Sequence, residues 1–268
     1  MFKPLFAVVL VSSMAACSGG GSSDGPAPEE KANPAGIWRG TLTDLLEVDS
    51  NPQAGAHDLF IMADGNGHVR IISDNANGDF LGRGELRNIE GNEFRGYLDV
   101  YSYSPTATPD NPDPNPEQLR HAKITGELVA RDHWTGDIEF DNLKLYTFEA
   151  AYDAAESLKG ASITTLSDLG VFGGASVNEG QSITLVFSPD GTFTGYDESC
   201  SYRGTVSVPD SAYNLYQFSL LIEDLSNCPS TLRKTTYGGT GALVDEQGVR
   251  TLKMLVKNSK QILVFELQ

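Results

Sequence analysis

The feature that most constrains the fold is a period-two alternation of apolar and polar residues, which begins at Gly36 and recurs to the end of the chain. The alternating runs are short, and turn-forming residues separate them, as at 64–67 (Asp-Gly-Asn-Gly) and 189–191 (Pro-Asp-Gly). Gly, Asn and Asp tolerate the positive φ angles of tight hairpin turns, and Pro presets the φ angle that opens a turn. The pattern therefore predicts an all-β chain of hairpin-connected antiparallel strands.

Residues 36–148 contain eight such runs, and we interpret them as an N-terminal β-barrel domain. The expected strands are 36–42, 57–62, 68–73, 80–86, 92–103, 123–131, 134–140 and 142–148. Eight short strands with hairpin spacing are typical of a small antiparallel barrel or sandwich. Residues 104–118 are rich in proline, which cannot donate to a strand ladder, so this segment is expected to be a long loop.

The alternation is interrupted after Phe148. Apolar residues then recur at helical spacing, at Phe148, Tyr152, Ala155 and Leu158, and Gly160 is a natural helix end. We therefore expect a short helical linker within residues 149–166.

Residues 167–268 repeat the pattern of the first half and predict a C-terminal β-barrel domain. The expected strands are 170–176, 181–188, 192–196, 201–208, 214–223, 237–244, 250–257 and 261–267. Internal matches pair 124–129 with 239–244, 82–86 with 202–206, and the Phe-Glu dipeptide at 148–149 with that at 265–266. These matches favour duplication of one eight-strand unit, with a coincidence of β patterns as the alternative.

The last expected strand is apolar on both faces. Ile262 and Val264 share one face, and Leu263, Phe265 and Leu267 share the other. An eight-strand barrel is nearly filled by its own side chains, so the second apolar face needs cover from outside. We therefore expect two packed eight-strand antiparallel barrel-like domains joined by a short helix.

The first residues carry an export signal. Lys3 precedes a short apolar run at residues 5–11, and Ala15 and Ala16 lead into Cys17. This stretch resembles the lipobox of bacterial lipoproteins, with Met14 where Leu is commoner. The alternative is a secreted protein whose signal is cut nearby, because the apolar run is far below the ~20 residues that span a bilayer.

The lipobox resemblance implies a lipid anchor and a location. Residues 1–16 would be the signal peptide, and Cys17 would receive diacylglycerol and palmitate as the membrane anchor. Residues 17–35 are rich in Gly, Ser and Pro and are expected to be a disordered tether. Ser18 follows the cysteine, which in this family indicates sorting to the outer membrane, on its periplasmic face or at the cell surface.

The net charge of the chain limits the kinds of molecule that it can bind. The formal net charge of −17 disfavours nucleic acid and favours cationic partners over anionic ones.

With Cys17 lipidated, Cys200 and Cys228 remain as an even pair in an oxidising compartment, which indicates one disulfide. The chain lacks the catalytic and nucleotide-binding motifs that we sought, so we expect no enzymatic activity, no catalytic residue and no cofactor.

Two sets of residues remain as candidate sites. Tyr97, Tyr101 and Tyr103 share one face of an expected strand and, with Trp134, are the candidate binding surface, because tyrosines are favoured at interfaces. A barrel wall explains the same tyrosines equally well. Asp113, Asn115 and Glu117 alternate in the proline-rich loop, but their spacing lacks features of a calcium loop, and we expect no metal site.

Further resemblances are to whole proteins. The chain is similar to a group of uncharacterised Gram-negative outer-membrane lipoproteins in three places: the lipobox, the segment from Tyr152 to Gly170, and residues 197–228. The architecture is similar to two-lobed surface lipoproteins such as factor H-binding protein, and Gly36-Ile37-Trp38 resembles the first-strand motif of lipocalins.

These observations favour a lipid-anchored binding or structural protein of the cell envelope without catalytic activity. The alternatives are a lipocalin-like carrier of a small apolar ligand and an acidic inhibitor of a basic enzyme such as lysozyme.

Overall fold

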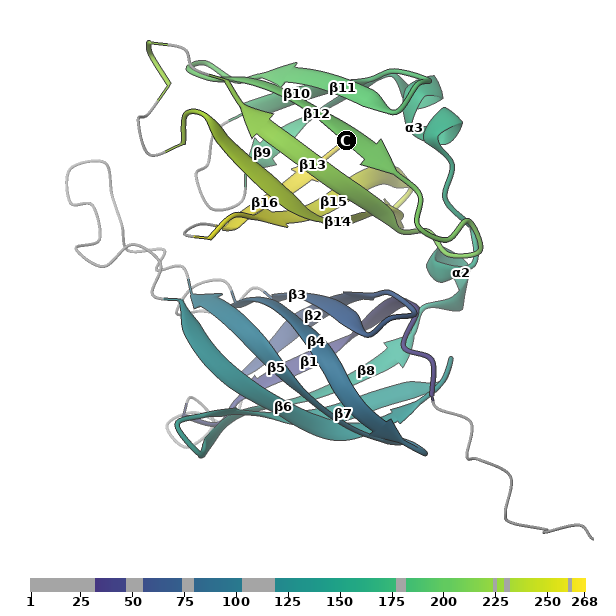
Figure 1. Cartoon of the computed structure of the whole chain (residues 1–268). Coiled ribbons are helices and arrows are strands. Elements are labelled where there is room, and N and C mark those ends of the chain that lie inside the picture. The colour runs from purple at the N-terminus through teal and green to yellow at the C-terminus, as the bar shows by residue number, and fades with distance from the viewer. Residues whose placement is uncertain are drawn as a thin grey trace, which may run out of the picture. The chain divides into compact units, whose positions relative to one another are not determined.

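Two closed antiparallel barrels of eight strands each, with a short helical connection, make up the part of the chain that the structure describes (Figure 1). This computed structural model describes residues 32–46, 55–73, 80–102, 119–176, 182–223, 226–228, 232–259 and 262–268. The predicted fold class, two eight-strand barrels joined by a short helix, is confirmed. The expected signal peptide, Cys17 and almost all of the tether lie outside the described residues.

The first barrel is a meander in which each strand pairs with the next and β1 closes on β8. Its strands are β1 Gly36–Asp44, β2 Ala56–Ala63, β3 His68–Ser73, β4 Phe80–Glu90, β5 Glu93–Ser102, β6 Arg120–Val129, β7 His133–Phe140 and β8 Leu143–Tyr152.

The second barrel has the same order and closes through β9 and β16. Its strands are β9 Val171–Ser176, β10 Ser182–Phe187, β11 Thr192–Tyr196, β12 Ser201–Ser207, β13 Tyr216–Ile222, β14 Thr235–Glu246, β15 Val249–Lys257 and β16 Ile262–Leu267.

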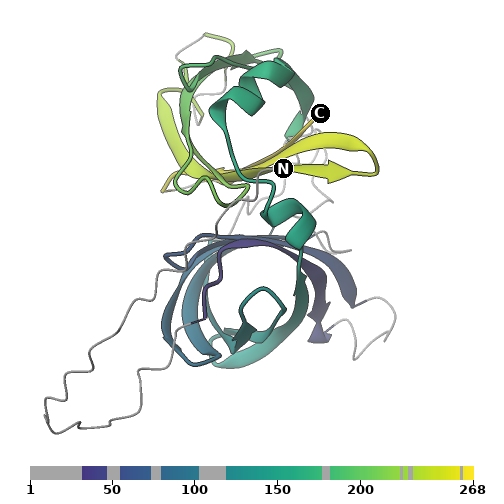
Figure 2. The same ribbon diagram turned by 90° about the vertical axis from the view of Figure 1, so that its right-hand side faces the viewer.

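The connection between the barrels differs from the predicted helical linker at residues 149–152, which are part of a strand. Residues up to Tyr152 continue strand β8, because this strand pairs on both sides and Tyr152 is in register with Trp38 of β1. The helices are α2 (Ala154–Ser157) and α3 (Ile163–Leu169). Helix α3 lies across one end of the second barrel, where Leu166 is fully buried (Figure 2).

Aromatic side chains fill both barrels. In the first, Trp134 packs edge-on against Trp38, Phe94 and Phe148, with ring centroids 5.5 to 6.0 Å apart. In the second, Phe187 contacts the rings of Phe172, Phe193 and Phe218 at 5.2 to 6.3 Å. Edge-to-face pairs of this kind add to the stability gained by burial. The barrel interiors are therefore packed cores.

Matched glycines support duplication of one barrel. A Cβ atom at Gly84 of β4 would overlap the carbonyl oxygen of Tyr97, and one at Gly204 of β12 would overlap that of Ser219. Each glycine lies in the fourth strand of its barrel, and the two are equivalent in the internal match of 82–86 with 202–206. The other two matches also fall on corresponding strands, the sixth and the eighth.

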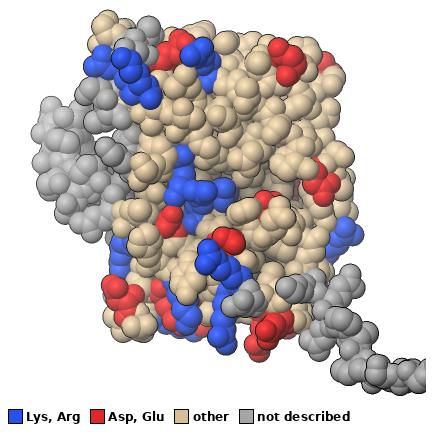
Figure 3. All heavy atoms as spheres, in the orientation of Figure 1, with Lys and Arg blue, Asp and Glu red and all other residues tan. Residues whose placement is uncertain are grey.

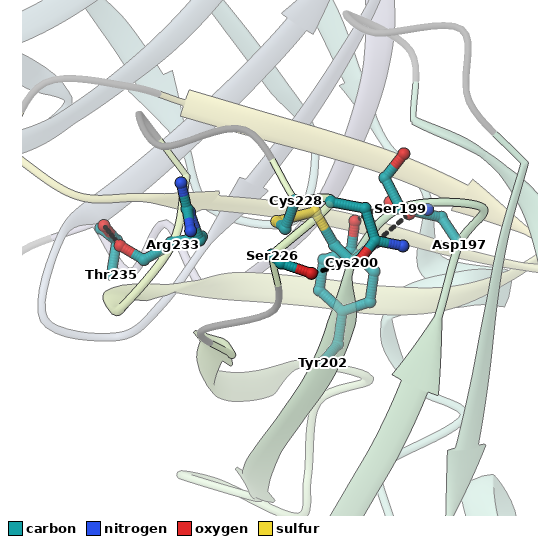
Figure 4. The surroundings of a disulfide bond; sticks show 9 residues. Asp197, Ser199, Cys200, Tyr202, Ser226, Cys228, Arg233 and Thr235 are labelled. Carbon is teal, nitrogen blue, oxygen red and sulfur yellow. Dashed lines mark hydrogen bonds between the residues drawn. A yellow bond between two sulfur atoms is a disulfide. The ribbon is translucent and has the colours of Figure 1, made fainter.

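The predicted disulfide between Cys200 and Cys228 is confirmed. It joins the start of β12 to the segment that follows β13, and both cysteines are buried (Figure 4). Beside it, the Asp197 carboxylate accepts hydrogen bonds from the backbone N–H groups of Ser199 and Cys200 and from the Tyr202 hydroxyl. The bridge therefore fixes a turn and a loop at one end of the second barrel.

Replacing Cys200→Ala and Cys228→Ala together should lower the free energy of unfolding by about 3–4 kcal/mol, because the bridge closes a loop with a sequence separation of 28. Urea unfolding of the oxidised protein and of the double variant measures the difference. The reduced wild-type protein is the control and should match the variant. Equal stability of the oxidised protein and the variant would contradict the prediction.

Candidate functional site

The site that the fold assembles is the junction between the outer faces of the two barrels. The buried apolar side chains there form one cluster that draws on both: Ala35, Ile37, Phe60, Met62, Ile72, Leu81, Tyr101, Tyr213, Leu215, Ala242, Val244, Leu255, Ile262 and Val264. The two apolar faces of β16 explain this arrangement. Ile262 and Val264 belong to the junction, whereas Leu263, Phe265 and Leu267 belong to the core of the second barrel.

Buried polar groups join the barrels beside the apolar cluster. The Ser157 hydroxyl of α2 accepts a hydrogen bond from the Ile37 N–H at 2.8 Å and donates one to the Ile37 carbonyl at 3.2 Å. The Ser157 carbonyl accepts a hydrogen bond from the Asn214 N–H at 2.9 Å. The Asn214 side chain in turn donates to the Leu243 carbonyl at 2.7 Å. Helix α2 is thus bonded to both barrels.

A charged cluster borders one side of the junction. Lys253 Nζ lies 2.9 Å from a Glu246 carboxylate oxygen and 2.8 Å from one of Glu266. Lys253 Nζ and the Arg39 guanidinium both approach the Phe60 ring, at 5.3 and 5.0 Å from its centroid. Burial alone would lower the pKa of Lys253, but hydrogen bonds and charge interactions with Glu266 and Glu246 outweigh it and raise the pKa.

A cavity of about 310 Å³ opens beside this cluster. Its lining includes Arg39, Asp58, Phe60, Glu246, Lys253 and Glu266, which come from both barrels. Four of these charges pair with one another: besides the Lys253 contacts with Glu246 and Glu266, Arg39 Nη1 lies 3.6 Å from a Glu246 oxygen. A polar molecule entering this cavity would have to compete with those ion pairs.

A second charged group borders another part of the junction. Arg70, Arg83, Asp99 and His121 lie directly opposite one another in consecutive strands β3 to β6. Lys257 of β15 reaches across from the second barrel, and its Nζ lies 2.7 Å from an Asp99 oxygen. His121 Nδ1 lies 2.9 Å from the other Asp99 oxygen. Burial would raise the pKa of Asp99, but the interactions with Lys257 and His121 hold it below the usual value.

Asp99→Asn should destabilise the protein at pH 7 and lose this effect in acid. Because the folded-state pKa of Asp99 is lowered, its contribution is fully present above the ordinary carboxyl pKa, about 4, and disappears as the pH falls through the folded-state value. Urea unfolding of wild type and variant at pH 7, 5 and 3 measures the difference. A stability gap that stays constant or widens toward pH 3 would contradict the role of this ion pair.

The structure separates the residues of the predicted binding surface. Tyr97 is 63% exposed on the outer face of β5, whereas Tyr101 of the same face is 1% exposed because it lies in the junction. Trp134 is 0% exposed inside the first barrel, and Tyr103 lies outside the described residues. Of the four, only Tyr97 is therefore seen to be available at the surface, where Arg87 lies 5.9 Å from its ring centroid.

Three acidic residues near Trp134 in sequence contact basic side chains at the surface. Asp132 contacts His133, Asp137 contacts Lys144 and Glu139 contacts Lys123, at 2.8 to 3.1 Å. Exposed pairs of this kind contribute little to stability.

Among the described residues, no group of three or more His, Cys, Asp or Glu side chains could hold a metal ion. The loop acids Asp113 and Glu117 lie outside those residues.

The junction residues were missed at the level of sequence because they come from distant strands. Arg39 and Lys253 each occupy an outward position of a strand, where a charged side chain by itself indicates a solvated face. The doubly apolar strand β16 predicted that an outer barrel face is covered but not by which residues. Strand β2 carries the same signal, because Leu59 and Ile61 share one face and Phe60 and Met62 share the other.

Comparisons of the chain with protein-family models, with curated proteins and with solved structures found no match. None of the helices in the described part of the chain is long and apolar enough to cross a membrane.

Proposed function

We propose that this chain is a lipid-anchored protein of the outer membrane that binds a partner through the outer surfaces of two rigid barrels and carries out no catalysis. The observation that carries the proposal is the filling of both barrels by aromatic side chains. Trp38 and Trp134 in the first barrel, and Leu185 and Phe193 in the second, are buried and make up the interior cores. The groups available for recognition therefore lie outside.

This packing favours the binding role over the lipocalin-like carrier. A carrier needs an apolar cavity inside a barrel, whereas the cavity beside Lys253 lies at the junction and has a charged lining. Gly36-Ile37-Trp38 places Trp38 in the core, where its indole N–H donates to the Pro34 carbonyl at 2.9 Å. This tryptophan acts as a packing residue.

The net charge of −17 supports a cationic protein partner. An acidic inhibitor of a basic enzyme is one form that such a role would take. Tyr97, the exposed tyrosine of the predicted binding surface, lies beside Arg87 and Glu85 in a mixed surface and offers contact area for such a partner.

Both tryptophans of the chain lie inside the first barrel, which allows a direct test against the carrier. Titration with the neutral apolar dye N-phenyl-1-naphthylamine should give no saturable energy transfer from tryptophan and no saturable rise in dye emission. Energy transfer reports entry into the first barrel, and dye emission reports entry into either barrel. The denatured protein is the control for non-specific dye contact. Saturable 1:1 binding by the folded protein would favour the carrier.

Lipidation at Cys17 should be required for membrane attachment. Metabolic labelling with an alkyne-palmitate should mark the wild-type chain, which should fractionate with the outer membrane, while Cys17→Ser should be unlabelled and released from the membrane fraction. Ser18→Asp is the matched control and should remain labelled but move to the inner membrane. Protease treatment of intact cells then distinguishes the cell surface from the periplasm. Labelling of Cys17→Ser would contradict the anchor.

A further inference from the structure

We propose that Arg70, Arg83 and Lys257 form a binding site for a small oxyanion, a phosphate or sulfate group, at the junction of the two barrels. The proposal goes beyond the anchored binding role and does not depend on the lipid or on a protein partner. It starts from the second charged group of the junction.

The first observation is a pair of like charges that face each other. Arg70 of β3 and Arg83 of β4 are directly opposite in the antiparallel register. Opposite residues have Cβ atoms about 4.5–5.5 Å apart, and like charges in that arrangement are destabilising. Neither arginine forms an ion pair within the described residues. A bound anion between the two guanidinium groups would remove this repulsion.

The second observation is that Arg70 is buried with part of its guanidinium unpaired. The residue is 5% exposed, and its Nε has no hydrogen-bond partner. Its Nη1 donates to the carbonyl of the neighbouring Val69 at 2.8 Å. Burial and the charge of Arg83 lower the pKa of Arg70 to about 10, although Asp64 acts in the opposite direction. A buried donor without a partner is costly, and an oxyanion would supply the missing acceptor.

The third observation is that the second barrel adds another cation. Lys257 lies beside the row formed by Arg70, Arg83, Asp99 and His121, because its Nζ contacts an Asp99 oxygen at 2.7 Å. The other Asp99 oxygen contacts His121. Counting Arg70, Arg83 and Lys257 as positive and Asp99 as negative, these four side chains carry a formal net charge of about +2. Figure 3 shows basic side chains at the level where the barrels meet, with acidic side chains beside them. This concentration of positive charge stands out in a chain with a net charge of −17.

The chemistry of the donors selects the ligand class. The planar guanidinium fork matches the oxygen geometry of phosphate, sulfate and carboxylate, and lysine adds a point charge. A dianion is favoured over a monoanion because the local excess is about two charges. The group would be free phosphate, or the phosphate of a lipid or glycan headgroup, since both present the same oxygens.

The test is titration of the full chain with sodium phosphate at pH 7 by calorimetry, with chloride keeping the ionic strength constant. We expect saturable 1:1 binding and a rise in the thermal midpoint with phosphate concentration. Arg83→Gln should weaken binding about tenfold or more, because a charge-assisted hydrogen bond is lost. Lys257→Gln should weaken it in the same direction.

Arg203→Gln is the matched control. Arg203 is an exposed arginine of β12, paired with Glu223 at 3.3 Å, and its replacement removes the same charge away from the junction. Phosphate affinity should then stay within about twofold of wild type. Titration with glycerol 3-phosphate tests whether the ligand is a headgroup phosphate. If glycerol 3-phosphate binds more tightly than inorganic phosphate, the ligand is a headgroup; if it binds equally or more weakly, the ligand is free phosphate.

A second signature separates a ligand site from a purely structural pair. In chloride alone, Arg83→Gln should change the free energy of unfolding little, because it removes both the repulsion from Arg70 and the attraction to Asp99, which lie opposite Arg83 on its two sides. In phosphate, it should lose the stabilisation that wild type gains. Absence of saturable phosphate binding to wild type, or an equal loss of binding in Arg203→Gln and Arg83→Gln, would overturn the proposal.

Discussion

The contact between the apolar outer faces of the two barrels is the interaction on which the rest of the structure depends. Ile37 and Met62 of the first barrel and Leu255 and Val264 of the second are fully buried although none points into a barrel interior. Exposed, these faces would form one of the large apolar patches that soluble proteins rarely show. Their burial brings Lys253 to Phe60 and Lys257 to Asp99, so the charged groups at the margin depend on it.

The filled barrel interiors and the edge of the junction together indicate where a ligand or partner can bind. An eight-strand barrel leaves space that side chains nearly fill, and here tryptophan and phenylalanine occupy it. Duplication of such a unit provides something that a single barrel lacks, namely an interface whose edge combines side chains from two sheets. The cavity near Lys253 and the arginine row near Lys257 both lie on that edge.

How well the sequence predicts each feature depends on how far apart in the chain the interacting residues lie. Alternation and turn residues act over a few positions, so the strands and their division into two eight-strand barrels could be predicted, and an even number of remaining cysteines was enough to predict the disulfide. The helix prediction is wrong at 149–152 because apolar residues four apart also fit an alternating strand, and only pairing with β1 and β7 decides between them.

The site was less predictable because burial of an outward residue depends on a distant segment. Tyr97 and Tyr101 are equivalent by alternation, yet only Tyr101 lies under the second barrel. The facing of Arg70 and Arg83 depends on the register between β3 and β4, which a one-residue slip would abolish. Neither fact is encoded in a local motif.

The bonds of Ser157 have a mechanical consequence. Ile37, in the first strand, is clamped to Ser157, which in turn is bonded to Asn214. A pull on the chain ahead of β1 would therefore reach both barrels at once and load the hydrogen bonds of β1 with β2 and β8 along the strand direction, in shear. Strands loaded in this way must break many bonds together rather than one after another, so the fold would resist a pull directed along β1.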